Sequence, residues 1–214
     1  MNSKMKFSDI EPLLIEKISS VASSEDPAHD LLHFQRVVRA AKNLCEKEGG
    51  NLDVVGPAAW LHDLVIVPKN DPRRSQASRL SAEAATQFLT ELGYSKELLP
   101  EIAHAVEAHS FSAGIEARTL EAKIVQDADR LDGLGAIGIA RCFATAGLMK
   151  RAFYADDDAF CETRTPDDRK YTIDHFFVKL FKTAETLQTE SGRAEGAKRV
   201  AIMKRYITDL AGEI

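Results

Sequence analysis

The chain has 214 residues and a net charge of −5, and its apolar share of 44% and charged share of 29% are those of a soluble globular protein. The acidic balance, with a pI near 5.7, argues against a general nucleic-acid binder, so we expect no stable nucleic-acid partner. We find neither a bilayer-spanning apolar run nor a secretory signal and expect a cytoplasmic protein without a membrane partner. Three scattered cysteines predict free thiols, not a disulfide framework.

Apolar residues recur at helical spacing along nearly the whole chain, and no strand-like alternation persists. In chain order, we expect a helix over residues 10–18, a helix start at 24–27 followed by a helix over about 29–48, and a short helix from about 52. Further helices are expected over 78–92, 97–109, 120–131, 133–143, 171–188 and 194–210. Residues 147–169 hold two acidic runs and are expected to form a loop or flap. The pattern therefore predicts an all-α fold.

A His-Asp pair, His62-Asp63, follows the apolar segment 56–61, while His33 and Asp129 stand on other predicted helices. Imidazole and carboxylate are ligands for divalent metals of intermediate softness. Neighbours on a regular helix point about 100° apart, so both can reach one ion only if it lies beside the helix. His33 and Asp129 would then complete the site from partner helices. Such a metal would activate water and polarise a phosphoryl oxygen, which predicts hydrolysis of a phosphate ester or anhydride.

A single His-Asp dipeptide is weak support for a metal site, because chance produces it readily. His29-Asp30 is a second copy in the same chain. Taken alone, either dipeptide is better interpreted as structural. The prediction of a metal site therefore depends on the whole set of residues, in this order and at plausible helix separations.

The same residues resemble the HD-domain superfamily of metal-dependent phosphohydrolases, and in particular its bacterial members with H-D-x-x-H-x-x-R-V, H-D and D-A-D-R-L-D motifs. Here the motifs are His29-Asp30-x-x-His33-x-x-Arg36-Val37, His62-Asp63 and Asp127-Ala128-Asp129-Arg130-Leu131-Asp132-Gly133. The resemblance extends to residues 107–112 and to His175-Phe176 with Lys179-Leu180, so it covers most of the chain. It implies an all-α helical bundle with a metal at its centre, ligated by His33, His62, Asp63 and Asp129.

The resemblance implies one HD-type domain over residues 1–214. Its metal-binding core is expected over about 25–145, with C-terminal helices within 171–213 completing the bundle and 147–169 as the loop or flap. The cofactor is expected to be one divalent ion, of Mn, Mg, Co, Ni, Fe or Zn. The family pattern Ala-Asp-x-Leu favours Asp129 over Asp127 as the ligand, because residues two apart on a helix face different directions.

Asp63 is expected to act both as a ligand and as the acceptor for the attacking water, and His109 is the second candidate catalytic residue. His104 is interpreted as a core histidine. The candidates for substrate binding are His29, Arg36, Lys69, Arg73, Arg74, His175 and Lys179. Each has a structural alternative: helix-terminal chemistry for His29, an ion pair for Arg36, a solvated loop for the cations of 69–74 and a surface stripe for the last two.

The resulting hypothesis is a metal-dependent phosphohydrolase acting on a small phosphorylated molecule, expected to be a nucleotide. Among the HD proteins that the chain resembles, those with the most similar motifs are associated with nucleoside triphosphate pyrophosphohydrolysis. One alternative is a phosphodiesterase acting on a cyclic nucleotide or short nucleic acid. Others are a non-catalytic sensor that binds metal and nucleotide and a structural bundle with incidental histidines.

Overall fold

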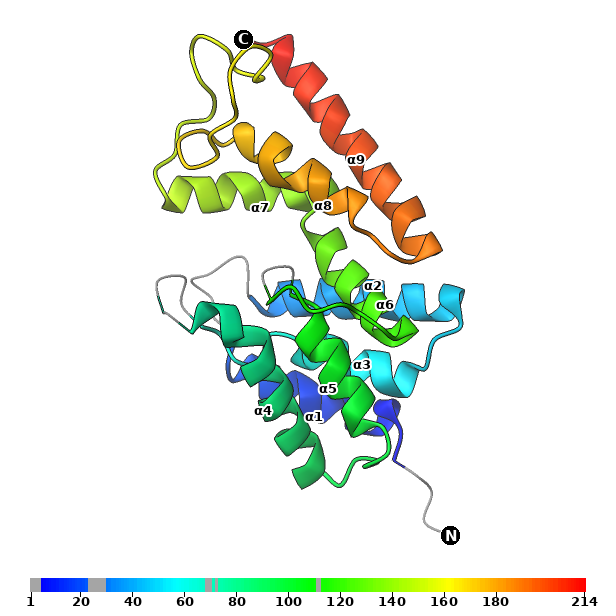
Figure 1. Cartoon of the computed structure of the whole chain (residues 1–214). Helices are drawn as coiled ribbons and strands as arrows, with labels where there is room; N and C mark the ends of the chain where they lie inside the picture. Colours follow the sequence, from blue (N-terminus) through cyan, green and yellow to red (C-terminus); the bar gives the residue numbers. More distant parts are fainter. Residues whose placement is uncertain (1–4, 23–29, 68–70, 72, 111–112) are drawn as a thin grey trace. The chain divides into compact units, whose positions relative to one another are not determined.

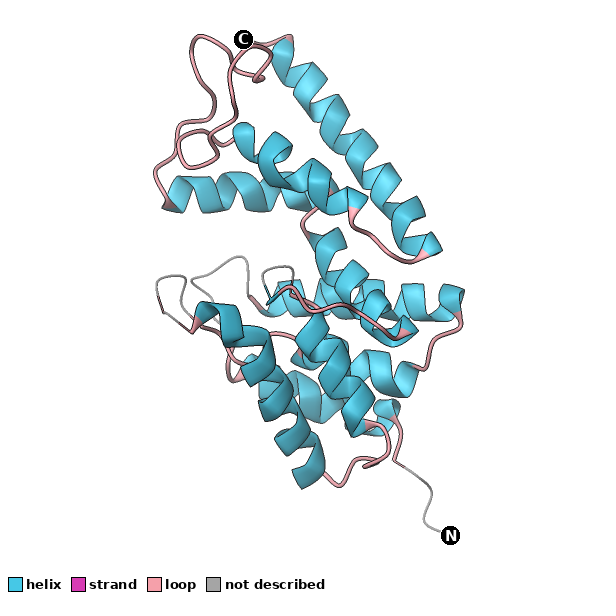
Figure 2. Cartoon of the chain, viewed as in Figure 1, coloured by secondary structure: helices cyan, strands magenta, loops and turns pink. Residues whose placement is uncertain are grey.

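The structure is a computed structural model that describes residues 5–22, 30–67, 71, 73–110 and 113–214. Within these residues every regular element is helical, apart from an isolated β-bridge between Ala152 and Tyr171 (Figures 1 and 2). The α-helices are α1 (Phe7–Ser19), α2 (Leu31–Glu48), α3 (Leu52–Leu61), α4 (Ala77–Glu91), α5 (Leu99–Ala108), α6 (Leu120–Asp132), α7 (Gly135–Leu148), α8 (Phe181–Glu185) and α9 (Glu190–Ala211). A 3-10 turn, η1 (Arg74–Gln76), precedes α4, and a π-helix, η3 (Phe176–Leu180), precedes α8. The expected all-α class is confirmed.

The chain divides into two compact units. The first holds Met1–Asp129 with Gln188–Ser191, and the second holds Arg130–Leu187 with Gly192–Ile214. The boundary falls inside α6, between consecutive residues of one helix. The organisation of residues 1–214 as one HD-type domain therefore stays a prediction.

The first unit is built around α3, which packs against α1, α2, α4 and α5 (Figure 1). All its residues from Val54 to Leu61 are buried, because this stretch carries no charged side chain and a helix that is apolar all round belongs in a core. Gly56 permits the close approach of α1, since a Cβ there would lie 2.6 Å from the Phe7 ring. At the same contact, Trp60 Nε1 donates to Glu11 Oε1 of α1 at 3.1 Å. The core thus fixes the end of α3, after which His62 follows.

The ends of α2 follow from local chemistry. Asp30 caps the helix, because its Oδ1 accepts from the backbone N–H of His33 at 2.7 Å. Gly49 ends it in a left-handed conformation, with a φ of 73° that glycine adopts without strain. The helix expected from residue 29 therefore begins at Leu31. The expected helix start at 24–27 lies outside the described residues.

The second unit packs aromatic rings of α7, η3 and α9 together. Phe176 of η3 stacks on Tyr206 of α9 with 6.0 Å between ring centroids, and Phe143 of α7 meets Tyr206 at 5.9 Å. The helix expected over 171–188 is shorter than predicted, because helical structure begins at Asp174, continues through the π-helix η3 and ends at Glu185. Thr172 and Ile173 before it form a turn, and buried Asp174, the first helical residue, accepts hydrogen bonds from the Arg164 guanidinium at 2.6 and 2.7 Å.

The described part of the chain contains no single helix that is both long and apolar enough to cross a membrane. The consecutive helices α6 and α7 reach that length and apolarity only when taken together, a property that buried helices of soluble proteins share. Cys45, Cys142 and Cys161 are free thiols, as the sequence predicts.

Candidate metal centre

Three histidines and two aspartates of the first unit come together from four helices. His33 lies in the first turn of α2, and Asp129 lies on α6. His62 directly follows the last residue of α3, with Asp63 next to it. His109 directly follows the last residue of α5. The four residues predicted as ligands are therefore neighbours in space, together with the predicted catalytic histidine.

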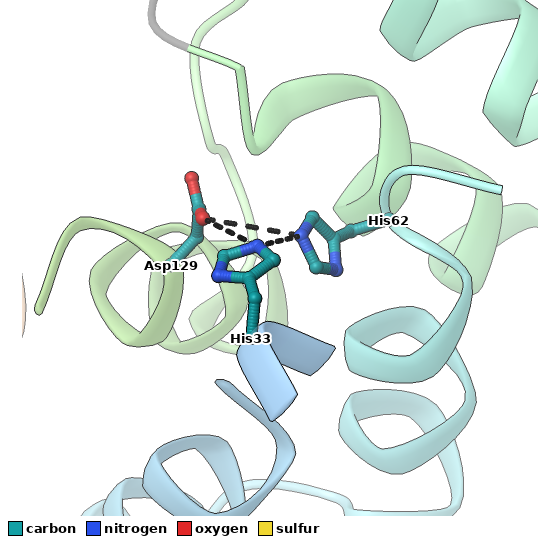
Figure 3. A group of neighbouring side chains, drawn as sticks. All are labelled: His33, His62 and Asp129. Carbon is teal, nitrogen blue, oxygen red and sulfur yellow. Dashed lines mark hydrogen bonds and ion pairs between the residues drawn. The ribbon is translucent and has the colours of Figure 1, made fainter. Parts of the chain in front are cut away.

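One group of these side chains consists of His33, His62 and Asp129, whose polar atoms face one another in Figure 3. The Nε2 atoms of the two histidines lie 3.3 Å apart. Asp129 Oδ1 lies 3.7 Å from His33 Nε2 and 3.9 Å from His62 Nε2. Metal–ligand bonds of about 2.0–2.2 Å place neighbouring ligand atoms roughly 3–3.5 Å apart. The spacing of this group is thus close to what one ion requires.

A second group consists of His62, Asp63 and His109. Asp63 Oδ2 lies 3.8 Å from His62 Nε2, and its other oxygen, Oδ1, lies 3.4 Å from His109 Nε2. The rings of His62 and His109 are edge-on at 4.9 Å between centroids. Asp63 thus lies next to both histidines of the second group, and His62 also belongs to the first group. Asp63 therefore connects the first group to His109.

Two of the histidines are oriented by carbonyl groups at helix ends. His62 Nδ1 donates to the backbone oxygen of Ala59 at 2.8 Å, and His109 Nδ1 donates to that of Val106 at 2.6 Å. The last carbonyls of a helix lack intrahelical partners, so a histidine just after the helix can use one. Because a carbonyl only accepts, each Nδ1 carries the proton, and in the neutral ring the lone pair of Nε2 faces the cluster. This is the tautomer that a metal ligand needs.

The protonation of the two rings differs because only one of them is strongly paired. Complete burial lowers the pKa of His62 to about 4, although Asp63 and Asp129 act in the opposite direction. Burial would also lower the pKa of His109, but the hydrogen bond and charge of Asp63 outweigh it and raise that pKa to about 9. At neutral pH and without metal, His62 is neutral and His109 is an imidazolium paired with Asp63.

The donor set fits a divalent cation. Neutral imidazoles supply nitrogen, and two carboxylates supply compensating negative charge. The histidines are buried, whereas the Asp63 and Asp129 side chains keep 21% and 29% of their surface exposed. A solvent molecule or ligand therefore reaches the cluster from the carboxylate side.

Asp127 is turned away from the cluster, although it lies only two residues before Asp129. Its fully buried carboxylate accepts from the backbone N–H of Gln188 at 2.9 Å and from that of Thr189 at 2.7 Å. The Thr189 hydroxyl adds a third hydrogen bond at 2.7 Å. Asp129 lies beside the histidines, as the family pattern predicts, and Asp127 holds the residues that precede α9.

The remaining candidates for substrate binding differ in what the structure shows of them. Half-buried Arg36 lies one turn beyond His33 on α2. Arg73 pairs with Asp71 at 2.9 Å, and Arg74 Nη1 donates to the Val67 oxygen at 2.6 Å, which favours the structural interpretation of this loop. His29 and Lys69 lie outside the described residues, and His175 and Lys179 belong to the second unit. Their roles in substrate binding stay predictions.

Sequence reasoning missed the direct contact between His109 and Asp63. A signal for it was present, because Val106-x-x-His109 repeats the spacing of Ala59-x-x-His62 at a helix end. His104, five residues earlier, is not part of the cluster: its Nε2 accepts from the backbone N–H of Arg118 at 3.1 Å. His104 therefore has a structural partner, but it is half-buried and not the core histidine that we expected.

The fold and the cluster define an all-α protein with a His/Asp group that could hold a metal ion, and comparison with known proteins identifies its family. The family model "HD domain" matches residues 31–134, which include the whole cluster. The chain is 31% identical over 201 residues to YpgQ of Bacillus subtilis (strain 168), covering 92% of this chain and 90% of that protein. The chain belongs to the HD superfamily of hydrolases, as its motifs predict.

Solved structures agree with this assignment over nearly the full length. The crystal structure of B. subtilis YpgQ in complex with ADP matches with a TM-score of 0.72 and 34% identity, covering 94% of this chain and 97% of that one. The crystal structure of an HD-superfamily hydrolase from Bacillus thuringiensis matches with a TM-score of 0.75 and 30% identity, covering 98% of each chain. The similarity therefore includes residues of both compact units.

Proposed function

We propose that the protein is a metal-dependent phosphohydrolase that cleaves a phosphate ester or anhydride of a nucleotide. The observation that carries this proposal is the convergence of the His33 and His62 imidazole nitrogens with the Asp63 and Asp129 carboxylates in one cluster. The nucleotide is supported by YpgQ, a relative of similar length whose crystal structure contains ADP. Within this class we favour nucleoside triphosphate pyrophosphohydrolysis, the activity that the sequence motifs suggest.

The residues of the centre divide the chemical work. A divalent ion held by His33, His62, Asp63 and Asp129 would lower the pKa of a coordinated water and polarise a phosphoryl oxygen. Asp63 can accept the proton of the attacking water, because its carboxylate is part of the cluster and partly exposed. His109 holds a proton on Nε2 beside Asp63 and is the candidate donor to the leaving oxygen. Water attack forms the new P–O bond as the bond to the leaving oxygen breaks.

Metal content and turnover of matched variants test the proposal. Protein stripped with EDTA is reloaded separately with Mn, Mg, Co, Ni, Fe and Zn, and a nucleotide panel is assayed for phosphate and pyrophosphate release. We expect His62→Ala to lose both bound metal and turnover. His104→Ala, a histidine outside the cluster, should retain both. Full metal content and activity in His62→Ala would overturn the proposal, and nucleotide binding without product release would favour a sensor instead.

A further inference from the structure

A separate set of polar side chains lies in the second unit, at the start of the π-helix η3. His175 directly precedes η3, and its Nδ1 lies 2.8 Å from Asp168 Oδ2. Lys179, four residues after His175, is exposed on the same side of the turn. π-Helical turns are rare and frequently mark functional sites, so this segment merits a chemical explanation.

Arg151 is brought to the same place by backbone pairing. The residue after it, Ala152, donates to the oxygen of Lys170 at 3.2 Å and accepts from the N–H of Thr172 at 2.9 Å. This pairing sets Arg151 beside the turn that carries Asp168 and His175. Among the described residues, no acceptor faces the buried Nε of Arg151, and its guanidinium forms no ion pair with a described acid. A buried donor without an acceptor is uncommon in folded proteins.

The electrostatics of His175 include the charges of both cations. Burial is the largest cause that lowers the pKa of His175, the Asp168 carboxylate opposes it, and Lys179 and Arg151 lower it further. The Cys142 thiol lies 3.7 Å from the Thr172 oxygen, and burial raises its pKa to about 11, with smaller contributions from Arg151 and Asp168. The thiol is therefore uncharged, and Asp168 is the anion set against two permanent cations.

We propose that Arg151, His175 and Lys179 form an anion site that takes a phosphate or pyrophosphate group. The choice of phosphate chemistry rests on the proposed function, whereas the anion site rests on these residues alone. Arg151 offers a planar fork of donors that matches two phosphate oxygens, and Lys179 adds a point charge. Asp168 holds the His175 ring through Nδ1. When Nε2 is protonated, its N–H can donate a hydrogen bond to the anion.

Inorganic pyrophosphate is the probe that isolates this site. The full chain carrying His62→Ala is kept in EDTA, so that the metal centre contributes no metal-bound anion, and ionic strength is matched with sodium chloride. Calorimetry should show saturable binding of pyrophosphate. Nitrogen NMR of the His175 ring should show its pKa rising when pyrophosphate is present, because a bound anion favours the protonated ring.

Matched variants decide whether the named cations make the site. Arg151→Gln should weaken pyrophosphate binding at least tenfold, Lys179→Gln should weaken it less, and Arg151→Lys should restore part of the loss. Lys182→Gln removes the same charge from an exposed side chain that does not perturb His175, so it should bind as the parent does. Thermal melts of each variant confirm folding.

Absence of saturable binding in the parent protein would overturn the proposal, as would equal losses in Arg151→Gln and Lys182→Gln. These results are distinguishable from failure of the proposed function, which is measured as metal content and turnover. A protein that hydrolyses nucleotides yet binds no pyrophosphate in EDTA would lack this site and keep the proposed activity. A protein that binds pyrophosphate through Arg151 but turns over nothing would keep the site and lack the activity.

Discussion

His109 Nε2 lies 3.4 Å from Asp63 Oδ1, and this contact keeps a buried imidazole protonated. The contact pairs His109, a predicted catalytic residue, with Asp63, a predicted metal ligand. In the metal-free protein, the folded-state pKa of His109 is about 9, above the value of about 6.5 expected in the unfolded chain. The pair therefore contributes stability that is present in full below about pH 6.5.

The first prediction is a pH dependence of stability that Asp63 controls. In EDTA, the free energy of unfolding should fall as pH rises from about 6.5 through 9, by up to about 3 kcal/mol for this ring. Asp63→Asn removes the main cause that raises the pKa of His109, so that pKa should drop and this part of the slope should flatten. Urea unfolding at several pH values and NMR titration of the ring measure the two effects. An unchanged His109 pKa in Asp63→Asn would contradict the assigned cause.

The second prediction concerns metal-dependent stability. A ligand that binds only the folded state stabilises it by about 2.7 kcal/mol at one hundred times its Kd. For a chain of this size that corresponds to a rise in Tm of roughly 5–10 °C. His33→Ala removes one nitrogen of the first group and should abolish most of the rise. His104→Gln should keep it, and a full metal-induced shift in His33→Ala would show that His33 is not a ligand.

The third prediction separates the two aspartates of α6. Asp127→Ala should lower the free energy of unfolding by about 3 kcal/mol or more, because it removes the acceptor of the buried Thr189 donors and of the half-buried Gln188 N–H. Thr189→Val, which removes only the hydroxyl hydrogen bond, should cost about 1 kcal/mol. Metal bound per folded molecule should stay unchanged in both, as measured by elemental analysis. Loss of metal with normal stability would instead make Asp127 a ligand.

Much of the first unit could be predicted because its signals are local. An uninterrupted apolar stretch gives the buried helix α3, Gly49 ends α2, and the motif pattern distinguishes Asp129 from Asp127. The contact between His109 and Asp63 was harder to foresee, because it depends on the ends of two helices meeting. Hydrophobic periodicity describes which face of a helix is buried, and it carries no information about where two helix ends meet.

The second unit shows the same limit. Apolar spacing over 171–188 is compatible with one continuous helix, yet helical structure starts only at Asp174. What shortens it is a contact with the preceding loop, where Arg164 and the backbone N–H of Asp167 bind the Asp174 carboxylate. A tertiary hydrogen-bond network leaves no periodic pattern in the sequence. It can therefore shorten a helix that hydrophobic spacing alone predicts to be longer.

The last prediction tests that network. Burial alone would raise the pKa of Asp174, but the hydrogen bonds from Arg164 and from the N–H of Asp167 outweigh it, and the pKa is lowered. A lowered folded-state pKa contributes stability above the unfolded-state value of about 3.9, and that stability is lost as pH falls through the folded-state pKa. The effect of the pair should therefore be full at pH 7 and decline below about pH 4. Arg164→Ala should cost about 3–5 kcal/mol at pH 7, because it leaves a buried carboxylate without its cation.

The matched control for Arg164→Ala is Arg169→Ala, which breaks only the exposed pair with Asp167 at 3.3 Å. Exposed pairs contribute about 0–1 kcal/mol, so this variant should unfold nearly as the parent does. Urea unfolding of both variants at pH 7 and pH 3 compares them directly. The difference between them should be large at pH 7 and smaller at pH 3, where protonation of Asp174 begins to relieve the uncompensated charge in Arg164→Ala. Equal losses in the two variants at pH 7 would mean that the Arg164–Asp174 pair does not hold the turn before η3.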